Sequence, residues 1–199
     1  MKAVLASNNR NKLIELNEIL SALGIEVISQ RDLGLNLDVE ETGETFEENS
    51  YLKASAVCSR TGMIAIADDS GLAVDALGGA PGVRSHRYGT PDLDDEGRWR
   101  LLLKNMEGRT DRTCRFVCVI TCCFPDGRRL TARGTCEGTV AEVPAGENGF
   151  GYDPVFYIPE LGKTFAQLSG AEKNAVSHRG RALAQLAELL KRETENAWN

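Results

Sequence analysis

The sequence predicts an α/β fold in which helices flank a mixed β-sheet. In the first third of the chain, short apolar runs alternate with helical patterns, which favours parallel strands joined by helices. In the middle of the chain, an Asp126-Gly127 turn separates two strand-like runs, as is typical of an antiparallel hairpin. Neither a repeat nor a low-complexity linker interrupts the 199 residues. We therefore expect a single domain, residues 1–199, with two lobes around a central cleft.

The N-terminal part is expected to follow the order strand, helix, strand, loop, helix. Leu13, Leu16 and Leu20 recur at helical spacing, and Gly24 suits the C-cap that ends this helix. Thr45 suits the N-cap of the second helix. The expected elements are Lys2–Ala6, Asn11–Leu23, Ile25–Ser29, an acidic loop over residues 30–44, and a helix that continues to Arg60.

The rest of the chain is expected to add strands, a hairpin and two further helices. A strand over Met63–Ala67 ends in Asp68-Asp69-Ser70-Gly71, and polar residues at such a strand end face a cleft in most α/β folds. A Gly/Pro-rich connection over residues 78–82 follows. The remaining elements are a helix over Leu93–Met106, hairpin strands over Thr113–Phe124 and Arg128–Thr139, a Gly-rich loop over Pro144–Asp153, a strand over Val155–Ile158 and a helix over Ser177–Glu193.

Composition and charge limit the classes of partner. The net charge of -6 gives no overall basic field, which excludes nucleic acid as the main partner. A polyanionic substrate therefore needs a local cluster of Lys and Arg. The N-terminal apolar stretch ends at Ser7 and is too short for a signal peptide, and no apolar run approaches the roughly 20 residues of a membrane span. We expect a cytoplasmic protein.

The six cysteines are expected to be buried structural thiols. Five of them lie between Cys114 and Cys136, and Cys118 and Cys122 fall within a strand-like apolar run. The sequence contains no C-x-x-C pair, and its two histidines, His86 and His178, lie far from the cysteines. These features favour packing over a metal or redox site.

The first group of functional candidates is Ser7-Asn8-Asn9-Arg10-Asn11-Lys12, between the first strand and the first helix. Small polar side chains and two cations meet the free N–H groups of a helix N-terminus, and this combination binds anions. The segment does not match the Walker loop pattern. The alternative interpretation is a capped helix with solvated cations.

The second group is acidic and suits Mg²⁺, which prefers hard oxygen ligands and substrate phosphates. Its members are Glu40, Glu41, Glu44, Glu47, Glu48, Asp68 and Asp69. For the three glutamates after residue 43, a structural role that complements the helix dipole is favoured. Asp68 and Asp69 have no evident structural role after an apolar strand. Because adjacent strand residues point to opposite faces, we expect only one of them to act in the cleft.

The third group is Gly149-Phe150-Gly151-Tyr152-Asp153-Pro154, followed by Lys173 and by Ser177-His178-Arg179-Gly180. Glycines beside an aromatic residue suggest backbone close to a flat ligand, and Phe150 offers a face on which a base could stack. His178 and Arg179 can donate hydrogen bonds or contact phosphate. The alternative is a turn with a core Phe and a helix capped by Ser177.

Together these motifs closely resemble the inosine triphosphate pyrophosphatase family, the non-canonical purine NTP pyrophosphatases. The resemblance covers nearly the whole chain and keeps the order and spacing of the motifs. It rests on Ser7-x-Asn9-x-x-Lys12-x-x-Glu15, Glu40-Glu41-Thr42-Gly43, Ala67-Asp68-Asp69-Ser70-Gly71-Leu72, Gly79-Ala80-Pro81-Gly82, Phe150-Gly151-Tyr152-Asp153-Pro154 and Ser177-His178-Arg179.

This resemblance implies a homodimer with an elongated mixed sheet and two lobes around a nucleotide-binding cleft. It implies Mg²⁺-dependent conversion of ITP, dITP or XTP to the monophosphate and pyrophosphate. Glu40 and Asp69 would hold Mg²⁺, and Asp69 would also be the catalytic base for the attacking water. The substrate would contact Ser7, Asn8, Asn9, Arg10, Asn11, Lys12, Ser70, Phe150, Gly151, Tyr152, Asp153, Lys173, His178 and Arg179.

Two positions depart from the family pattern, namely Asn11, where many relatives carry Gly, and Ser7, where Thr is common. Neither departure removes a charge. Because Asn tolerates left-handed backbone better than other non-Gly residues, we expect the loop to keep its shape.

Purine selectivity has a physical basis in the C6 substituent. Inosine and xanthine present a carbonyl acceptor where adenine presents an amino donor, so donors such as His178 and Arg179 would be left buried and unpaired by ATP. Two other functions stay open: a non-catalytic nucleotide-binding protein, against which the acidic residues argue, and a pyrophosphatase that prefers modified pyrimidines.

Overall fold

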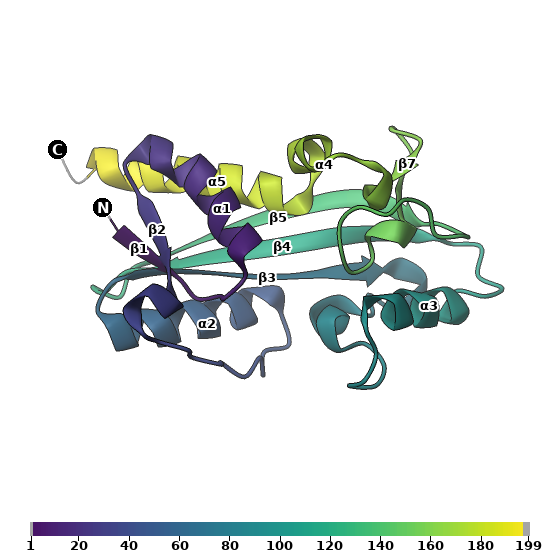
Figure 1. The fold of residues 1–199 in the computed structure, drawn as a ribbon, viewed down its shortest axis with the longest axis horizontal. Helices are drawn as coiled ribbons and strands as arrows, with labels where there is room; N and C mark the ends of the chain where they lie inside the picture. The colour runs from purple at the N-terminus through teal and green to yellow at the C-terminus, as the bar shows by residue number, and fades with distance from the viewer. Residues whose placement is uncertain (1, 197–199) are drawn as a thin grey trace. The chain divides into compact units, whose positions relative to one another are not determined.

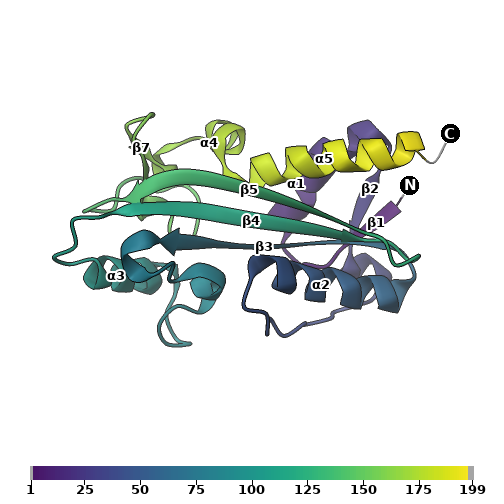
Figure 2. The same ribbon diagram turned by 180° about the vertical axis from the view of Figure 1, so that it is seen from behind.

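The structure, a computed structural model, describes residues 2–196 and has the expected α/β architecture (Figures 1 and 2). Within these residues, seven strands form one open sheet in the order β2-β1-β3-β4-β5-β6-β7. The sheet is mixed, because β1 pairs in parallel with β2 and β3, whereas β6 pairs antiparallel with β5 and β7. The strands are β1 Lys2–Leu5, β2 Glu26–Ser29, β3 Ile64–Val74, β4 Thr113–Cys123, β5 Arg129–Val140, β6 Phe156–Ile158 and β7 Lys163–Thr164.

Five α-helices accompany these strands in the described part of the chain, and short 3₁₀ turns link several elements. The helices are α1 Arg10–Leu20, α2 Phe46–Thr61, α3 Asp95–Asn105, α4 Gly170–Val176 and α5 His178–Asn196. The chain divides into two compact units. Unit 1 comprises residues 1–69, 118–134 and 181–199, and unit 2 comprises residues 70–117 and 135–180. That these units act as a single domain stays a prediction.

Unit 1 buries both faces of its strands. Figure 1 shows α1 and α5 on one face and α2 on the opposite face. Along β1, Ala3 and Leu5 pack in the core beneath α1 and α5, whereas Val4 packs in the core beneath α2. This alternation is the period-two geometry of a strand, and it fixes which face each later residue of the strands occupies. Buried Ser50 of α2 also shares a 2.8 Å hydrogen bond with Thr121 of β4.

Unit 2 has its own core, built around three aromatic rings. The ring centroids of Phe116 and Phe156 lie 4.6 Å apart, and those of Phe116 and Phe165 lie 5.6 Å apart. Leu102 and Met106, in α3 and directly after it, complete the apolar cluster. In both views α3 and α4 lie on opposite faces of this unit's strands (Figures 1 and 2). The aromatic cluster supports the loops that carry the third group of candidate residues.

The structure confirms most of the predicted elements and corrects several boundaries. β4 and β5 are neighbours joined by the tight turn at residues 124–128, so the hairpin is confirmed. The first helix is shorter than expected, because the α-helix ends at Leu20 and a 3₁₀ turn leads to Gly24. The strand expected over Val155–Ile158 begins at Phe156, after a 3₁₀ turn. The final helix is longer than expected, and β7 and α4 were not predicted.

The placement of Asp68 and Asp69 at a strand end was wrong. β3 runs for 11 residues from Ile64 to Val74 and includes the Asp-Asp-Ser-Gly segment. Both aspartates are buried within the sheet, at 8% and 6% exposure. Their carboxylates therefore need partners from the elements that cover the two faces.

All six cysteines are buried thiols outside any disulfide, which confirms the expectation of structural thiols. Burial raises the pKa of Cys122 to about 12 and that of Cys123 to about 11, so both stay protonated at neutral pH. Among residues 2–196, no helix is both long enough and apolar enough to cross a bilayer.

Helix α2 begins with a complete capping box. The Thr45 hydroxyl accepts the Glu48 N–H, and the Glu48 carboxylate accepts the Thr45 N–H in return. Glu47 forms a 2.5 Å ion pair with Arg133. Glu47 and Glu48 thus make structural contacts at the helix start, as the interpretation favoured from the sequence expected.

We predict that Thr45→Ala lowers the free energy of unfolding by about 1 kcal/mol, because it removes the side-chain acceptor for the Glu48 N–H. The matched control is Glu44→Ala, which changes the adjacent exposed residue and keeps its backbone N–H to Glu48. Urea denaturation of both variants measures the difference. Equal stability of the two variants would contradict a role for this cap.

Candidate functional site

Side chains of the Ser7–Lys12 segment cap the N-terminus of α1. The side-chain amide oxygen of Asn9 accepts the Lys12 N–H at 3.3 Å, and the Ser7 hydroxyl accepts the Asn9 N–H at 3.2 Å. Arg10 is exposed, but Lys12 is half-buried and its ammonium donates to Asp68 at 2.7 Å. The alternative of a capped helix is therefore right about the cap and wrong about a solvated Lys12.

Asn8, in the same loop, donates from its side-chain amide to Asn36 at 2.8 Å. The side chain of Asn11 lies outside the described part of the structure. Its backbone belongs to the first turn of α1, so the left-handed geometry considered for this position is not used. A helical Asn11 removes the conformational reason for Gly at this position in the present chain.

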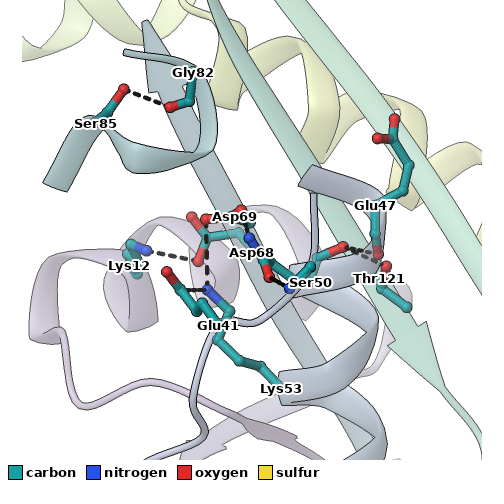
Figure 3. Close-up of polar contacts among 12 residues, drawn as sticks. Lys12, Glu41, Glu47, Ser50, Lys53, Asp68, Asp69, Gly82, Ser85 and Thr121 are labelled. Atoms are coloured by element: carbon teal, nitrogen blue, oxygen red, sulfur yellow. Dashed lines mark hydrogen bonds and ion pairs between the residues drawn. The ribbon is translucent and has the colours of Figure 1, made fainter. Parts of the chain in front are cut away.

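Asp68 and Asp69 point to opposite faces of β3, as expected for adjacent strand residues. Asp68 meets Lys12 of α1, whereas Asp69 accepts a 3.1 Å hydrogen bond from the Asn49 amide of α2. Figure 3 shows Lys12 and Lys53 directed toward this pair of carboxylates. Asp69, the expected catalytic base, is thus held by the helix whose start is fixed by the capping box.

Lys53 of α2 joins Asp69 to the acidic loop that precedes the helix. Its ammonium lies 2.5 Å from the Glu41 carboxylate and 3.7 Å from that of Asp69 (Figure 3). Burial by itself lowers the pKa of Lys53, but the carboxylates of Asp69, Asp68 and Glu41 outweigh it, and the pKa is raised. Lys53 therefore stays charged and neutralises part of the cluster.

The Asp69 carboxyl has a raised pKa. Burial is the largest cause, Lys53 opposes it, and nearby Glu41 raises the pKa further. A raised pKa brings a carboxylate closer to the range in which it can take a proton from water. The role of Asp69 as a general base stays a prediction, with which the direction of this pKa shift is compatible.

The two adjacent glutamates of the acidic loop differ in their surroundings. The side chain of Glu40, the expected metal ligand, is exposed, whereas Glu41 is half-buried beside Lys53. Among residues 2–196, no group of three or more Asp, Glu, His or Cys side chains is arranged to hold a metal ion by itself. Mg²⁺ is commonly held by one or two carboxylates together with substrate phosphates, and Asp69 with Glu41 fits that pattern.

In unit 2, the loop from Gly149 to Asp153 is built around a buried carboxylate. Asp153, whose side chain is 3% exposed, accepts the Phe150 N–H at 2.9 Å and the Lys173 ammonium at 2.5 Å. Burial raises the pKa of Asp153, and Lys173 opposes that rise. Gly149 has φ of 80°, and a Cβ there would lie 2.0 Å from the Asp153 carboxylate. This glycine is therefore required by the turn.

Phe150 exposes its ring close to two cations. The ring is 56% exposed, the Lys173 ammonium lies 4.7 Å from its centroid and the Arg179 guanidinium lies 5.9 Å from it. An exposed aromatic face beside cations can stack a flat base and contact negative charge. The sequence alternative of a core Phe at position 150 is wrong.

His178 begins α5 and stacks on the aromatic core of unit 2. Its ring lies 4.7 Å from that of Phe116 at an angle of 12°. The Ser177 hydroxyl accepts the Gly180 N–H at 3.1 Å and so caps the helix. The expected cap by Ser177 is confirmed, and the packing on Phe116 fixes the plane of the His178 ring. The role of His178 as a hydrogen-bond donor to the substrate stays a prediction.

The remaining expected substrate residues of unit 2 occupy the same loop or β3. Tyr152 is buried and donates from its hydroxyl to the Ser85 carbonyl at 2.8 Å. Gly151 donates its N–H to Asp95 at 2.8 Å. Ser70 is half-buried in β3. Tyr152 is thus an anchor of the loop, with its hydroxyl already engaged.

The sequence analysis missed Asn49 and Lys53, which contact Asp69 directly. They lie four residues apart in α2, and that spacing places them on one helix face. Since the Thr45 cap was predicted, the helical spacing of these two polar residues was a usable signal. Their pairing with β3 was not, because it depends on how α2 packs on the sheet.

A family model described as the Ham1 family matches residues 3–189, which is nearly the whole chain. The chain belongs to the Ham1 family. This membership accounts for the motifs of all three candidate groups, since they fall within the matched region.

Curated relatives and solved structures agree with this family. A dITP/XTP pyrophosphatase of Exiguobacterium sp. is 50% identical over 191 residues, covering 96% of this chain and 97% of the relative. One from Bacillus subtilis is 44% identical, covering 95% and 96%. The structure of the Staphylococcus aureus Ham1 protein matches with a TM-score of 0.92 and 44% identity, covering 97% of this chain and 100% of that chain.

We predict that Lys173→Met lowers the free energy of unfolding by about 3 kcal/mol at neutral pH, because it leaves the Asp153 carboxylate buried without its cation. The matched control is Lys163→Met, which removes an exposed lysine 3.9 Å from Glu172 and should cost less than about 0.5 kcal/mol.

The cost of Lys173→Met should shrink as the pH falls. Burial already holds the pKa of folded Asp153 above the ordinary value of 3.8, and loss of Lys173 raises it further. The folded variant then binds more protons than its unfolded chain, so acid stabilises it relative to neutral pH. Urea denaturation at neutral and mildly acidic pH tests this, and a cost that grows in acid would refute the assignment.

Proposed function

We propose that this chain hydrolyses non-canonical purine nucleoside triphosphates, namely dITP, XTP and ITP, to the monophosphate and pyrophosphate. The observation that carries the proposal is the buried Asp69 carboxylate with a raised pKa, oriented by Asn49 and flanked by Lys53. The dITP/XTP pyrophosphatases that share up to half of the chain's residues support the substrate class.

In this proposal the unit 1 residues act on the phosphate end of the substrate. The Ser7–Lys12 segment binds phosphate oxygens through backbone N–H groups, Asn side chains and Lys12. Asp69 takes a proton from the attacking water. The water oxygen forms a bond to phosphorus, the bridging P–O bond breaks and pyrophosphate leaves with the electron pair. Lys12 and Lys53 offset the charge that develops.

We propose Mg²⁺ as the cofactor, held by Asp69 and one carboxylate of the Glu40–Glu41 pair. When bound, the ion would neutralise phosphate charge and polarise the reacting linkage. The position of Glu41 beside Lys53 and Asp69 favours Glu41 as the second ligand. Glu40, the residue expected from the sequence, stays a prediction that a direct comparison of the two can test.

The unit 2 residues are proposed to recognise the nucleoside. Phe150 offers a stacking face, and Lys173, His178 and Arg179 offer donors to a C6 carbonyl. Ser70, Gly151, Tyr152 and Asp153 complete the proposed set. Adenine presents an amino group to the same donors, so ATP should be a poor substrate.

Two further properties belong to this proposal, the oligomeric state and the site of action. The resemblance to the pyrophosphatase family implies a homodimer, which light scattering can test. The proposed substrates belong to the cellular nucleotide pool, and six free buried thiols suit a reducing compartment. We therefore propose the cytoplasm as the site of action.

We predict that ITP, dITP and XTP are hydrolysed with at least about a hundredfold higher kcat/KM than ATP, because ATP would leave buried donors unpaired. Pyrophosphate release is measured with each nucleotide in the presence of Mg²⁺ and after chelation with EDTA. Chelation should abolish release. Comparable kcat/KM for ATP, or full activity in EDTA, would contradict the proposal.

We predict that Asp69→Asn lowers kcat by roughly 10²- to 10⁴-fold, the range that a general base contributes, while the protein stays folded. Glu41→Gln should raise the Mg²⁺ concentration for half-maximal activity, and Glu40→Gln serves as its neighbouring control. Mg²⁺ titrations of pyrophosphate release distinguish the two. A larger effect of Glu40→Gln would assign the ligand to Glu40 instead, and near-normal activity of Asp69→Asn would refute its role.

A further inference from the structure

Every residue of the loop from Phe150 to Asp153 has one defined anchor within unit 2. The Phe150 N–H is held by the Asp153 carboxylate, which itself pairs with Lys173. The Tyr152 hydroxyl is held by the Ser85 carbonyl at 2.8 Å. The Gly151 N–H is held at 2.8 Å by the carboxylate of Asp95, which lies 56 residues earlier in the chain.

Asp95 lies in the first turn of α3, and both of its carboxylate oxygens are engaged. One oxygen accepts the Gly151 N–H, and the other pairs with the Arg98 guanidinium at 2.8 Å. The Arg98 side chain is 13% exposed, so it is held against the protein and limits the rotation of Asp95. The Gly151 N–H therefore donates to a carboxylate that a neighbouring guanidinium also holds, and hydrogen bonds to a carboxylate are a strong type.

The loop depends on such an external anchor because its own backbone is permissive. Gly151 within the loop and Gly149 directly before it have φ of 61° and 80°, in the left-handed region that favours glycine. Glycine gives little resistance to rotation once a hydrogen bond is lost. Phe150, whose exposed ring is the proposed stacking face, stands between these two glycines.

We propose that Asp95 is a positioning residue for nucleobase recognition, acting through the Gly151 N–H on the orientation of the Phe150 ring. This inference rests on the proposed function of the loop. Asp95 takes no part in proton transfer, so its loss should weaken substrate binding and selectivity while leaving the chemical step intact. The expected kinetic result is a higher KM with little change in kcat.

The variants are Asp95→Ala, which removes the acceptor, and Asp95→Asn, which keeps an oxygen acceptor but loses the charge. Glu96→Ala is the matched control, because Glu96 is the next acidic residue of the same helical turn and pairs with Arg100 of its own helix at 2.6 Å. Both alanine variants remove one negative charge from the start of α3, so they change the helix dipole interaction alike.

We expect Asp95→Ala to raise KM for ITP about tenfold and to lower the ratio of kcat/KM for ITP over ATP, with kcat within about twofold of the wild type. Asp95→Asn should fall between Asp95→Ala and the wild type, and Glu96→Ala should match the wild type. Unchanged KM and selectivity in Asp95→Ala would overturn the proposal. Equal effects of Asp95→Ala and Glu96→Ala would also overturn it, because they would indicate a general effect on α3.

Hydrogen exchange at the Gly151 amide gives a readout that does not depend on turnover. Exchange should be faster in Asp95→Ala than in the wild type and unchanged in Glu96→Ala. If the wild type hydrolyses none of the nucleotides, the proposed function fails, and exchange at Gly151 still decides whether Asp95 holds the loop. Wild-type exchange in Asp95→Ala would refute the anchor itself.

Discussion

The structure of unit 1 depends on how Lys53 compensates buried negative charge. Asp69 is buried within β3, and a buried carboxylate is costly unless a cation or hydrogen bonds offset the loss of water. Lys53 lies beside both Asp69 and Glu41, and Asn49 adds a hydrogen bond one helical turn earlier. The position of α2 on the sheet is thus coupled to the charge on β3. The capping box at Thr45 stabilises the start of α2, and the hydrogen bond between Ser50 and Thr121 helps to fix the position of α2 on the sheet.

The alternation of side chains along β3 connects the Asp69–Lys53–Glu41 cluster to the proposed phosphate-binding segment, Ser7–Lys12. Because Asp68 and Asp69 are adjacent in β3, they must point to opposite faces, and each meets the lysine of the helix on its own face. Lys12 of α1 forms an ion pair with Asp68, and Lys53 of α2 forms one with Asp69. Two adjacent residues of β3 therefore fix the positions of two lysines that belong to different helices. The ion pair with Asp68 fixes the position of Lys12. In the proposed function, an anionic substrate would compete with Asp68 for the Lys12 ammonium, which would therefore still be able to bind phosphate.

Local patterns predicted much of the fold and part of the site. The Asp126-Gly127 hairpin, the Thr45 cap and the Gly24 C-cap were readable because each depends on a few neighbouring residues. The length of β3 could not be predicted, because Asp68, Asp69 and Gly71 have low strand propensity. Only pairing within the sheet overrides that propensity. Lys53 and Asp95 were missed for a related reason, because their roles depend on contacts between elements. The choice between Glu40 and Glu41 rests on burial, which two identical neighbouring residues do not reveal in sequence.

Unit 2 repeats the same physical arrangement with a different partner set. Asp153 is buried, its pKa is raised by burial, and one lysine, Lys173, compensates it. The Lys173 ammonium also lies over the rings of Phe150 and Phe165, so it contacts one carboxylate and two aromatic rings. A flat ligand on Phe150 would share that ammonium with Asp153. In the proposed function, ligand binding and the charge on Asp153 would therefore be linked through Lys173, as a phosphate ligand and Asp68 would be linked through Lys12. In each unit a buried aspartate thus fixes the position of a lysine that the proposed function places against the substrate.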